Sequence, residues 1–100
     1  MYRLEFSTQA YIDMQELSDT IMYIYKMPKT AEKYMRGLRM TIGQLKQNAE
    51  TFSVRYNESL QQYGSNVRRV NYKKMTVIYT VHGELVYIHR IVPASLIKGL

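Results

Sequence analysis

The chain has 100 residues and carries 14 Lys and Arg against eight Asp and Glu, so its formal net charge is +6. This length suits one domain with a single modest core, and the 46% of hydrophobic residues predicts a folded chain. The absence of cysteine excludes disulfide scaffolds and thiolate metal sites and fits a cytoplasmic protein. No apolar run approaches the roughly 20 residues of a membrane span, so no membrane association is expected.

The positive charge is concentrated in the second half of the chain. Residues 51–100 contain seven Lys and Arg against two Asp and Glu (+5), whereas residues 1–50 contain seven against six (+1). Such an asymmetry favours association with nucleic acid or with an acidic polypeptide. The alternative is a charge that serves only solubility.

The first half of the sequence predicts a strand followed by two helices. Apolar and charged residues alternate from Tyr2 to Phe6, which is typical of a half-buried strand, and Ser7 is a suitable helix N-cap. Apolar residues then recur at helical spacing, and Pro28 fits the first turn of a second helix. The two apolar stripes are Ala10, Met14, Leu17, Ile21 and Ile24, then Ala31, Tyr34, Leu38, Ile42 and Leu45.

These helices are expected to form an antiparallel hairpin with a tight connection near Pro28. Gly37 and Gly43 should weaken the second helix by about 1 kcal/mol each, and they are consistent with a close approach to the first helix. Residues 49–66 are polar and lack periodicity, which predicts a loop with one short helical turn from Asn57 to Tyr63.

Residues 67–93 predict three antiparallel strands. Val77–Val81 and Leu85–Val92 are rich in β-branched and aromatic residues, and the intervening His82, Gly83 and Glu84 are expected to form the hairpin turn. The order is therefore β-α-α-β-β-β, an α+β fold. We expect the N-terminal strand to join this antiparallel sheet, with the helices on one sheet face and the other face open or partly open.

Basic residues accompany the predicted sheet. They are expected to contact nucleic-acid phosphates or an acidic protein segment, although cations also protect edge strands from aggregation. Tyr56, Tyr63 and Tyr72 flank this region and could stack on bases or pack at the rim of the core. The binding candidates are Arg68, Arg69, Lys73, Lys74 and Arg90.

A second set of residues could support catalysis. RNA cleavage without a metal needs a base for the 2′-hydroxyl, an acid for the leaving oxygen and cations for the phosphate charge. Tyr87 and His89 lie two apart and would share a strand face, and Arg69 and Arg90 could supply charge. In a regular strand Arg90 would face away from His89. The alternative is a structural histidine beside a packing tyrosine.

Other chemistry is not indicated by the sequence. His82 in the predicted turn should be solvated, and two histidines alone give no metal-ligand spacing. Glycine-rich phosphate loops and nucleophile elbows are absent. No metal or cofactor is therefore expected.

The order of these segments and their amino-acid sequences resemble those of one known family. The resemblance spans nearly the whole chain, residues 1–100, as a single domain, and it points to the RelE/ParE superfamily of toxins. It rests on Ser7-Thr8-Gln9-Ala10, Pro28 with Ala31, Val67-Arg68-Arg69-Val70, Val77-Ile78-Tyr79-Thr80-Val81 and Val86-Tyr87-Ile88-His89-Arg90-Ile91.

The resemblance implies the toxin of a type II toxin–antitoxin system of the plasmid-stabilisation kind, which inhibits growth. The RelE branch cleaves mRNA on the translating ribosome, and the ParE branch poisons DNA gyrase. An antitoxin, expected here to be acidic and partly disordered, would wrap around the toxin and neutralise it.

Several positions depart from the family pattern. Thr76 stands where the RelE branch commonly has a catalytic arginine, and the tail after Pro93 has neither the arginine nor the tyrosine of that branch. Arg69 is a plausible counterpart of a basic residue on the preceding strand. At the last strand, Arg90 and Ile91 match the ParE pattern, whereas Pro93 and Ala94 replace its His and Gly. The sequence thus leans toward the ParE side, or toward a divergent member with an altered or lost activity. The interpretations that it leaves open are a gyrase inhibitor, a ribosome-dependent mRNA endoribonuclease and a degenerate binding module.

Overall fold

The computed structural model describes residues 1–97; the last three residues of the tail considered above lie outside the described residues. The observed order confirms the α+β class. Among the described residues, none of the helices is long and apolar enough to cross a membrane. The elements are β1 (Arg3–Phe6), α1 (Thr8–Asp19), a π-helical turn (Thr20–Ile24), α2 (Pro28–Gly43), α3 (Leu45–Asn48), a 3-10 helix (Glu58–Tyr63), β2 (Arg68–Tyr72), β3 (Met75–His82), β4 (Leu85–Pro93) and a 3-10 turn (Ala94–Leu96).

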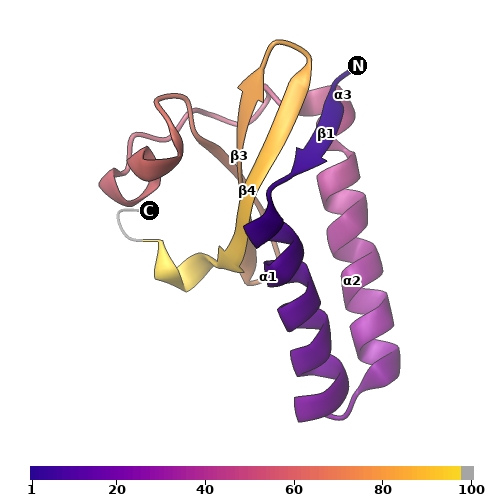
Figure 1. The fold of residues 1–100 in the computed structure, drawn as a ribbon. Helices are drawn as coiled ribbons and strands as arrows, with labels where there is room; N and C mark the ends of the chain where they lie inside the picture. The colour runs from indigo at the N-terminus through magenta and orange to yellow at the C-terminus, as the bar shows by residue number, and fades with distance from the viewer. Residues whose placement is uncertain (98–100) are drawn as a thin grey trace.

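The four strands form one mixed sheet in the order β1-β4-β3-β2. β2, β3 and β4 are antiparallel neighbours, as expected. β1 joins the sheet as expected and runs parallel to β4, which makes the otherwise antiparallel sheet mixed. Figure 1 shows β1 running beside β4 in the same direction, with α1 continuing from the end of β1.

The helices α1 and α2 form the expected hairpin and cover one face of the sheet (Figure 1). Ser7 begins α1 as the expected N-cap, since its hydroxyl accepts a hydrogen bond from the Ala10 backbone N–H at 3.0 Å. Pro28 occupies the first turn of α2, where its missing N–H costs nothing. The buried stripe of α2 packs against the sheet and consists of Ala31, Met35, Leu38 and Ile42.

The opposite face of the sheet is only partly open. The 3-10 helix Glu58–Tyr63, which confirms the expected short helical turn, lies on this side and will be called the cover segment. Leu60 of the cover segment is fully buried against Val67 and Ile78. The remaining surface of this face, along β3 and β4, will be called the open face.

One boundary differs from the sequence-based expectation. His82 ends β3 and pairs with Leu85, so the hairpin turn contains only Gly83 and Glu84. Gly83 has a φ of +61°, which a two-residue hairpin turn requires and which glycine adopts without strain. His82 therefore belongs to the sheet, and its side chain alternates onto the same face as that of Thr80.

Gly37 does mark a close approach, but its neighbour is on the sheet and not on α1. A Cβ added at Gly37 would lie 2.0 Å from the Tyr72 hydroxyl oxygen of β2, whereas one added at Gly43 would meet nothing within 4 Å. Gly37→Ala should therefore destabilise the protein by about 1–3 kcal/mol through overpacking. Gly43→Ala is the matched control and should stabilise it by about 0.5–1 kcal/mol. Denaturant unfolding measures both changes, and equal effects of the two variants would contradict this packing.

Candidate active site

An irregularity in β4 determines which side chains reach the open face. Tyr79 pairs with Ile88, but the preceding residue of β3, Ile78, pairs with Arg90. His89 is thus an extra residue, a β-bulge, and the alternation of side chains restarts after it. The expectation that His89 and Arg90 face opposite sides is therefore wrong.

The bulge directs the His89 imidazole toward a hydroxyl on the neighbouring strand. His89 Nε2 lies 2.8 Å from Thr80 Oγ1, and His82 Nε2 lies 2.7 Å from the same oxygen. Thr80 is only 3% exposed, so its hydroxyl is fixed between the two rings. A hydroxyl can accept from one imidazole N–H while donating to the unprotonated nitrogen of the other. The three side chains will be called the His–Thr–His cluster.

Two tyrosines enclose the cluster. The ring of Tyr87 meets that of His89 edge-on, with their centroids 4.8 Å apart. Tyr63, at the end of the cover segment, places its ring centroid 5.3 Å from that of His89. The predicted pair Tyr87 and His89 does share a face, as expected for residues two apart in a strand. Half-buried aromatic rings at this place can stack on nucleic-acid bases.

Burial affects the electrostatics of this cluster. It lowers the pKa of His89, and the positive charge of protonated His82 nearby acts in the same direction. His89 is therefore neutral at pH 7 and able to accept a proton. A neutral imidazole whose ring nitrogen lies within hydrogen-bond distance of a hydroxyl has the geometry that a general base needs.

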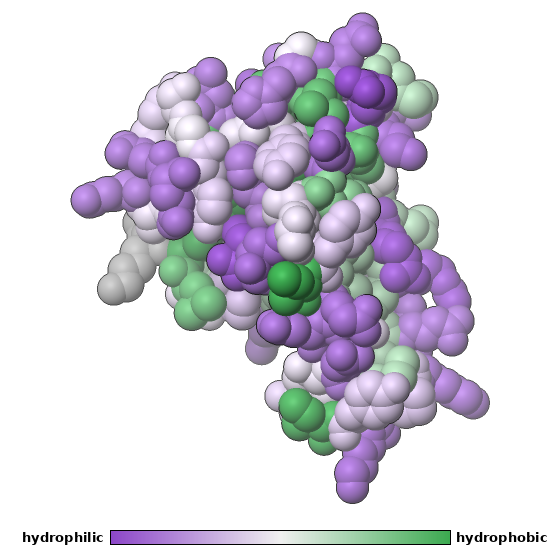
Figure 2. Space-filling model, viewed as in Figure 1, coloured by the Kyte–Doolittle hydropathy of each residue, from purple (hydrophilic) through white to green (hydrophobic). Residues whose placement is uncertain are grey.

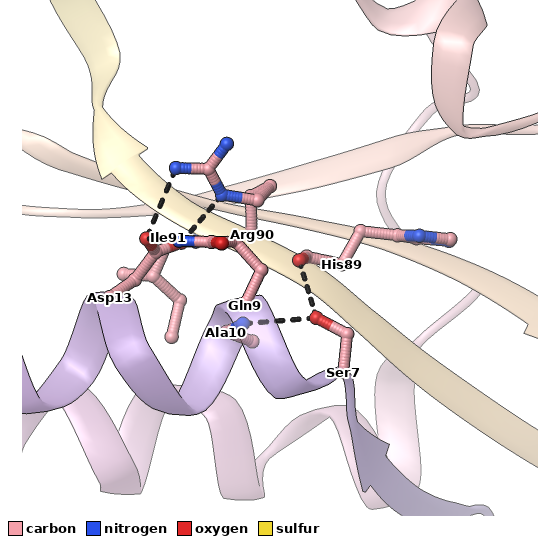
Figure 3. A network of polar contacts seen from close by, with 7 residues as sticks. All are labelled: Ser7, Gln9, Ala10, Asp13, His89, Arg90 and Ile91. Carbon is pink, nitrogen blue, oxygen red and sulfur yellow. Dashed lines mark hydrogen bonds and ion pairs between the residues drawn. The ribbon is translucent and has the colours of Figure 1, made fainter.

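Arg90 follows His89 in β4, and its guanidinium is held by an acidic residue of α1. Its Nε donates to Asp13 Oδ2 of α1 at 2.8 Å, and its Nη2 donates to Asp13 Oδ1 at 3.1 Å. The hydrogen bond with this carboxylate raises the pKa of Arg90 further above its ordinary value. Figure 3 shows the third guanidinium nitrogen pointing away from Asp13, and the His89 ring pointing away from α1.

The other predicted catalytic residue, Arg69, is not at the surface. Its side chain is 4% exposed, and it donates from Nε to Thr76 Oγ1 at 3.0 Å and from Nη2 to Asn71 Oδ1 at 3.2 Å. Burial lowers its pKa, and Arg55 adds repulsion. A guanidinium buried this deeply does not reach a phosphate at the surface, so Arg69 is not part of the candidate site.

The predicted basic residues do not share one surface. Arg68 alternates to the face opposite Arg69 and donates to the carbonyl oxygens of Glu50 and Phe52. Lys73 turns toward α2, where its ammonium nitrogen lies 5.4 Å from the centre of the Tyr34 ring. Lys74 is exposed in the turn between β2 and β3. Of the five predicted binding residues, only Arg90 lies at the cluster.

Sequence reasoning missed three contributors to the site. Thr80 and His82 are two residues apart on one strand, and this spacing in the sequence was enough to predict that their side chains share a face. Assigning His82 to the turn concealed that signal. Nothing in the sequence indicated that Asp13 belongs to the site. A single acidic residue outside the apolar stripe of a helix is predicted to be exposed to solvent.

The lowered pKa of His89 makes folding stability depend on pH. Because the folded pKa lies below the unfolded value of about 6.5, the contribution of His89 is complete above about pH 6.5 and is lost as the pH falls through the folded-state pKa. His89→Gln should remove this part of the pH dependence. Histidine NMR titration and denaturant unfolding between about pH 5 and pH 7.5 measure both effects. Titration of His89 at or above its ordinary pKa would contradict the burial described here.

Comparison with known proteins places this geometry on a known fold. No protein-family model matches the chain, and no curated protein matches it. Among solved structures it is similar to a chain of the "Chromosomal ParDE TA system from P. aeruginosa", with a TM-score of 0.76 and 21% identity over 93% of this chain and 96% of that one. The chain therefore shares the fold of that ParDE chain, in agreement with the fold that its order of elements predicted.

Proposed function

We propose that this protein is the toxin of a type II toxin–antitoxin pair and that its open face cleaves RNA without a metal ion. The fold shared with the ParDE system supports the first part. The observation that carries the second is the convergence of His82 Nε2 and His89 Nε2 on the Thr80 hydroxyl, at 2.7 and 2.8 Å. Two imidazoles within reach of one oxygen can supply both the base and the acid that phosphodiester cleavage needs.

The cluster residues take distinct roles in this proposal. His89, with its lowered pKa, accepts the proton of the RNA 2′-hydroxyl while the 2′-oxygen attacks the adjacent phosphorus. His82 is exposed, and in its protonated form it donates a proton to the departing 5′-oxygen. The products are a 2′,3′-cyclic phosphate and a free 5′-hydroxyl. Thr80 holds both rings in place before RNA binds.

The surroundings of the cluster support RNA as the substrate. The guanidinium nitrogen of Arg90 that is not bonded to Asp13 can bind a non-bridging phosphate oxygen, on which negative charge increases during the attack. Tyr63 and Tyr87 offer ring surfaces on which the flanking bases can stack. The position of cleavage would then depend on which nucleotides of the mRNA the ribosome presents to this site.

A groove between α1 and α2 is suited to an antitoxin segment. Its volume is about 650 Å³, and most of its lining is apolar, including Tyr11, Met14, Met22 and Met35. The basic residues of its lining, Lys29 and Arg39, outnumber the acidic Glu32 and would attract acidic side chains. An acidic segment that is disordered when free could fold into this groove on binding.

The cleavage proposal predicts a large effect of one substitution. Expression of the protein alone should arrest growth and fragment mRNA, and fragments should end in a 2′,3′-cyclic phosphate. His89→Gln should lower cleavage on programmed ribosomes by about 10²- to 10⁴-fold, because the base is lost. Its thermal unfolding should show that the fold persists.

Two outcomes of this expression experiment would contradict RNA cleavage and indicate a different function. DNA breaks with intact RNA would identify a gyrase-directed toxin and remove the cleavage proposal. Growth that continues at the normal rate, with RNA and DNA both intact, would identify a degenerate binding module.

A further inference from the structure

Asp13 is the most heavily bonded acidic side chain in the described part of the chain, and it connects α1 to the bulge of β4. The residue is 8% exposed. Its carboxylate accepts four hydrogen bonds (Figure 3 shows those from β4): two from Arg90 at 2.8 and 3.1 Å, one from the Ile91 backbone N–H at 2.9 Å, and one from the Gln9 side chain at 3.1 Å. These bonds outweigh the burial that opposes ionisation and lower the pKa of Asp13.

The backbone on both sides of the bulge is held by α1. The Ser7 hydroxyl donates to the His89 carbonyl oxygen at 2.7 Å, and Asp13 accepts from the N–H of Ile91. A bulge interrupts the regular ladder of hydrogen bonds, so its conformation must be fixed by groups outside the ladder. Here those groups belong to Ser7, the N-cap of α1, and to Asp13, six residues further along the same helix.

We propose that Asp13 is a positioning residue that fixes the bulge of β4, so that His89 faces Thr80 and one guanidinium nitrogen of Arg90 faces the phosphate. The inference rests on the cleavage function proposed above for this site. Asp13 touches no reacting atom. It acts through the backbone at Ile91 and through the orientation of Arg90.

A positioning role differs measurably from a role in folding alone. If Asp13 only stabilised the fold, Asp13→Asn would lower the melting temperature while kcat per folded molecule stayed at the wild-type value. If Asp13 positions the site, kcat falls and KM changes little, because RNA binds but His89 is misdirected. The His89 ring would also lose its bond to Thr80, and its ¹H and ¹⁵N resonances would shift.

The test compares Asp13→Asn with Glu32→Gln in the full chain. Glu32 forms a 2.8 Å ion pair with Arg36 on the exposed surface of α2, so its substitution also removes one carboxylate from an arginine but leaves β4 untouched. We expect Asp13→Asn to lower kcat for ribosome-bound mRNA by about 10- to 100-fold and to shift the His89 resonances. Glu32→Gln should match wild type in both.

Three other outcomes of this test are also informative. Wild-type kcat and unshifted His89 resonances in Asp13→Asn would overturn the proposal. If Asp13→Asn does not fold, Asp13→Glu serves, since it keeps the charge but displaces the carboxylate that holds Arg90 and the Ile91 N–H. Shifted His89 resonances would then support positioning, and unshifted ones would overturn it. If the wild type cleaves no RNA, the cleavage function fails, while the NMR comparison still shows whether Asp13 fixes His89.

Discussion

The unequal lengths of β1 and β4 impose the constraint on which the candidate site depends. β4 has nine residues, but β1 pairs only with Leu85 to Ile88. Backbone groups beyond Ile88 still need partners at that edge, because a buried unpaired N–H or C=O is costly. The beginning of α1 supplies them through Ser7 and Asp13. The strand edge is thus completed by a helix, and the bulge at His89 lies where strand pairing gives way to helix contacts.

Local signals allowed most of the fold to be predicted. The Ser7 cap, the apolar stripe of α2 and Pro28 each encode their element within a few residues, and tertiary packing agrees with them. The bulge could not be predicted, because a period of two assigns every side chain of β4 to a face and nothing in the sequence of β4 marks where the period slips. The partners that fix it lie more than 70 residues away in α1.

The same slip explains which parts of the site the sequence could identify. Tyr87 precedes the bulge and His89 lies at it, so ordinary alternation along the strand predicts correctly that they share a face. Arg90 follows it, so alternation assigned that residue to the wrong face. Charge counting overestimated the basic surface, because adjacent arginines in a strand, such as Arg68 and Arg69, point to opposite faces and bind their own chain. Function resides in such local geometry, whereas the fold supplies only the scaffold on which it is built.

The bulge itself is the central claim, and the strand register in solution tests it most directly. Nuclear Overhauser contacts across β3 and β4 report which residues lie opposite one another. The structure predicts contacts of Ile78 with Arg90 and of Tyr79 with Ile88, with the His89 ring protons close to the Thr80 methyl group. Contacts of Ile78 with His89 would indicate an unbroken ladder, would turn Arg90 to the other face, and would contradict this account of the site.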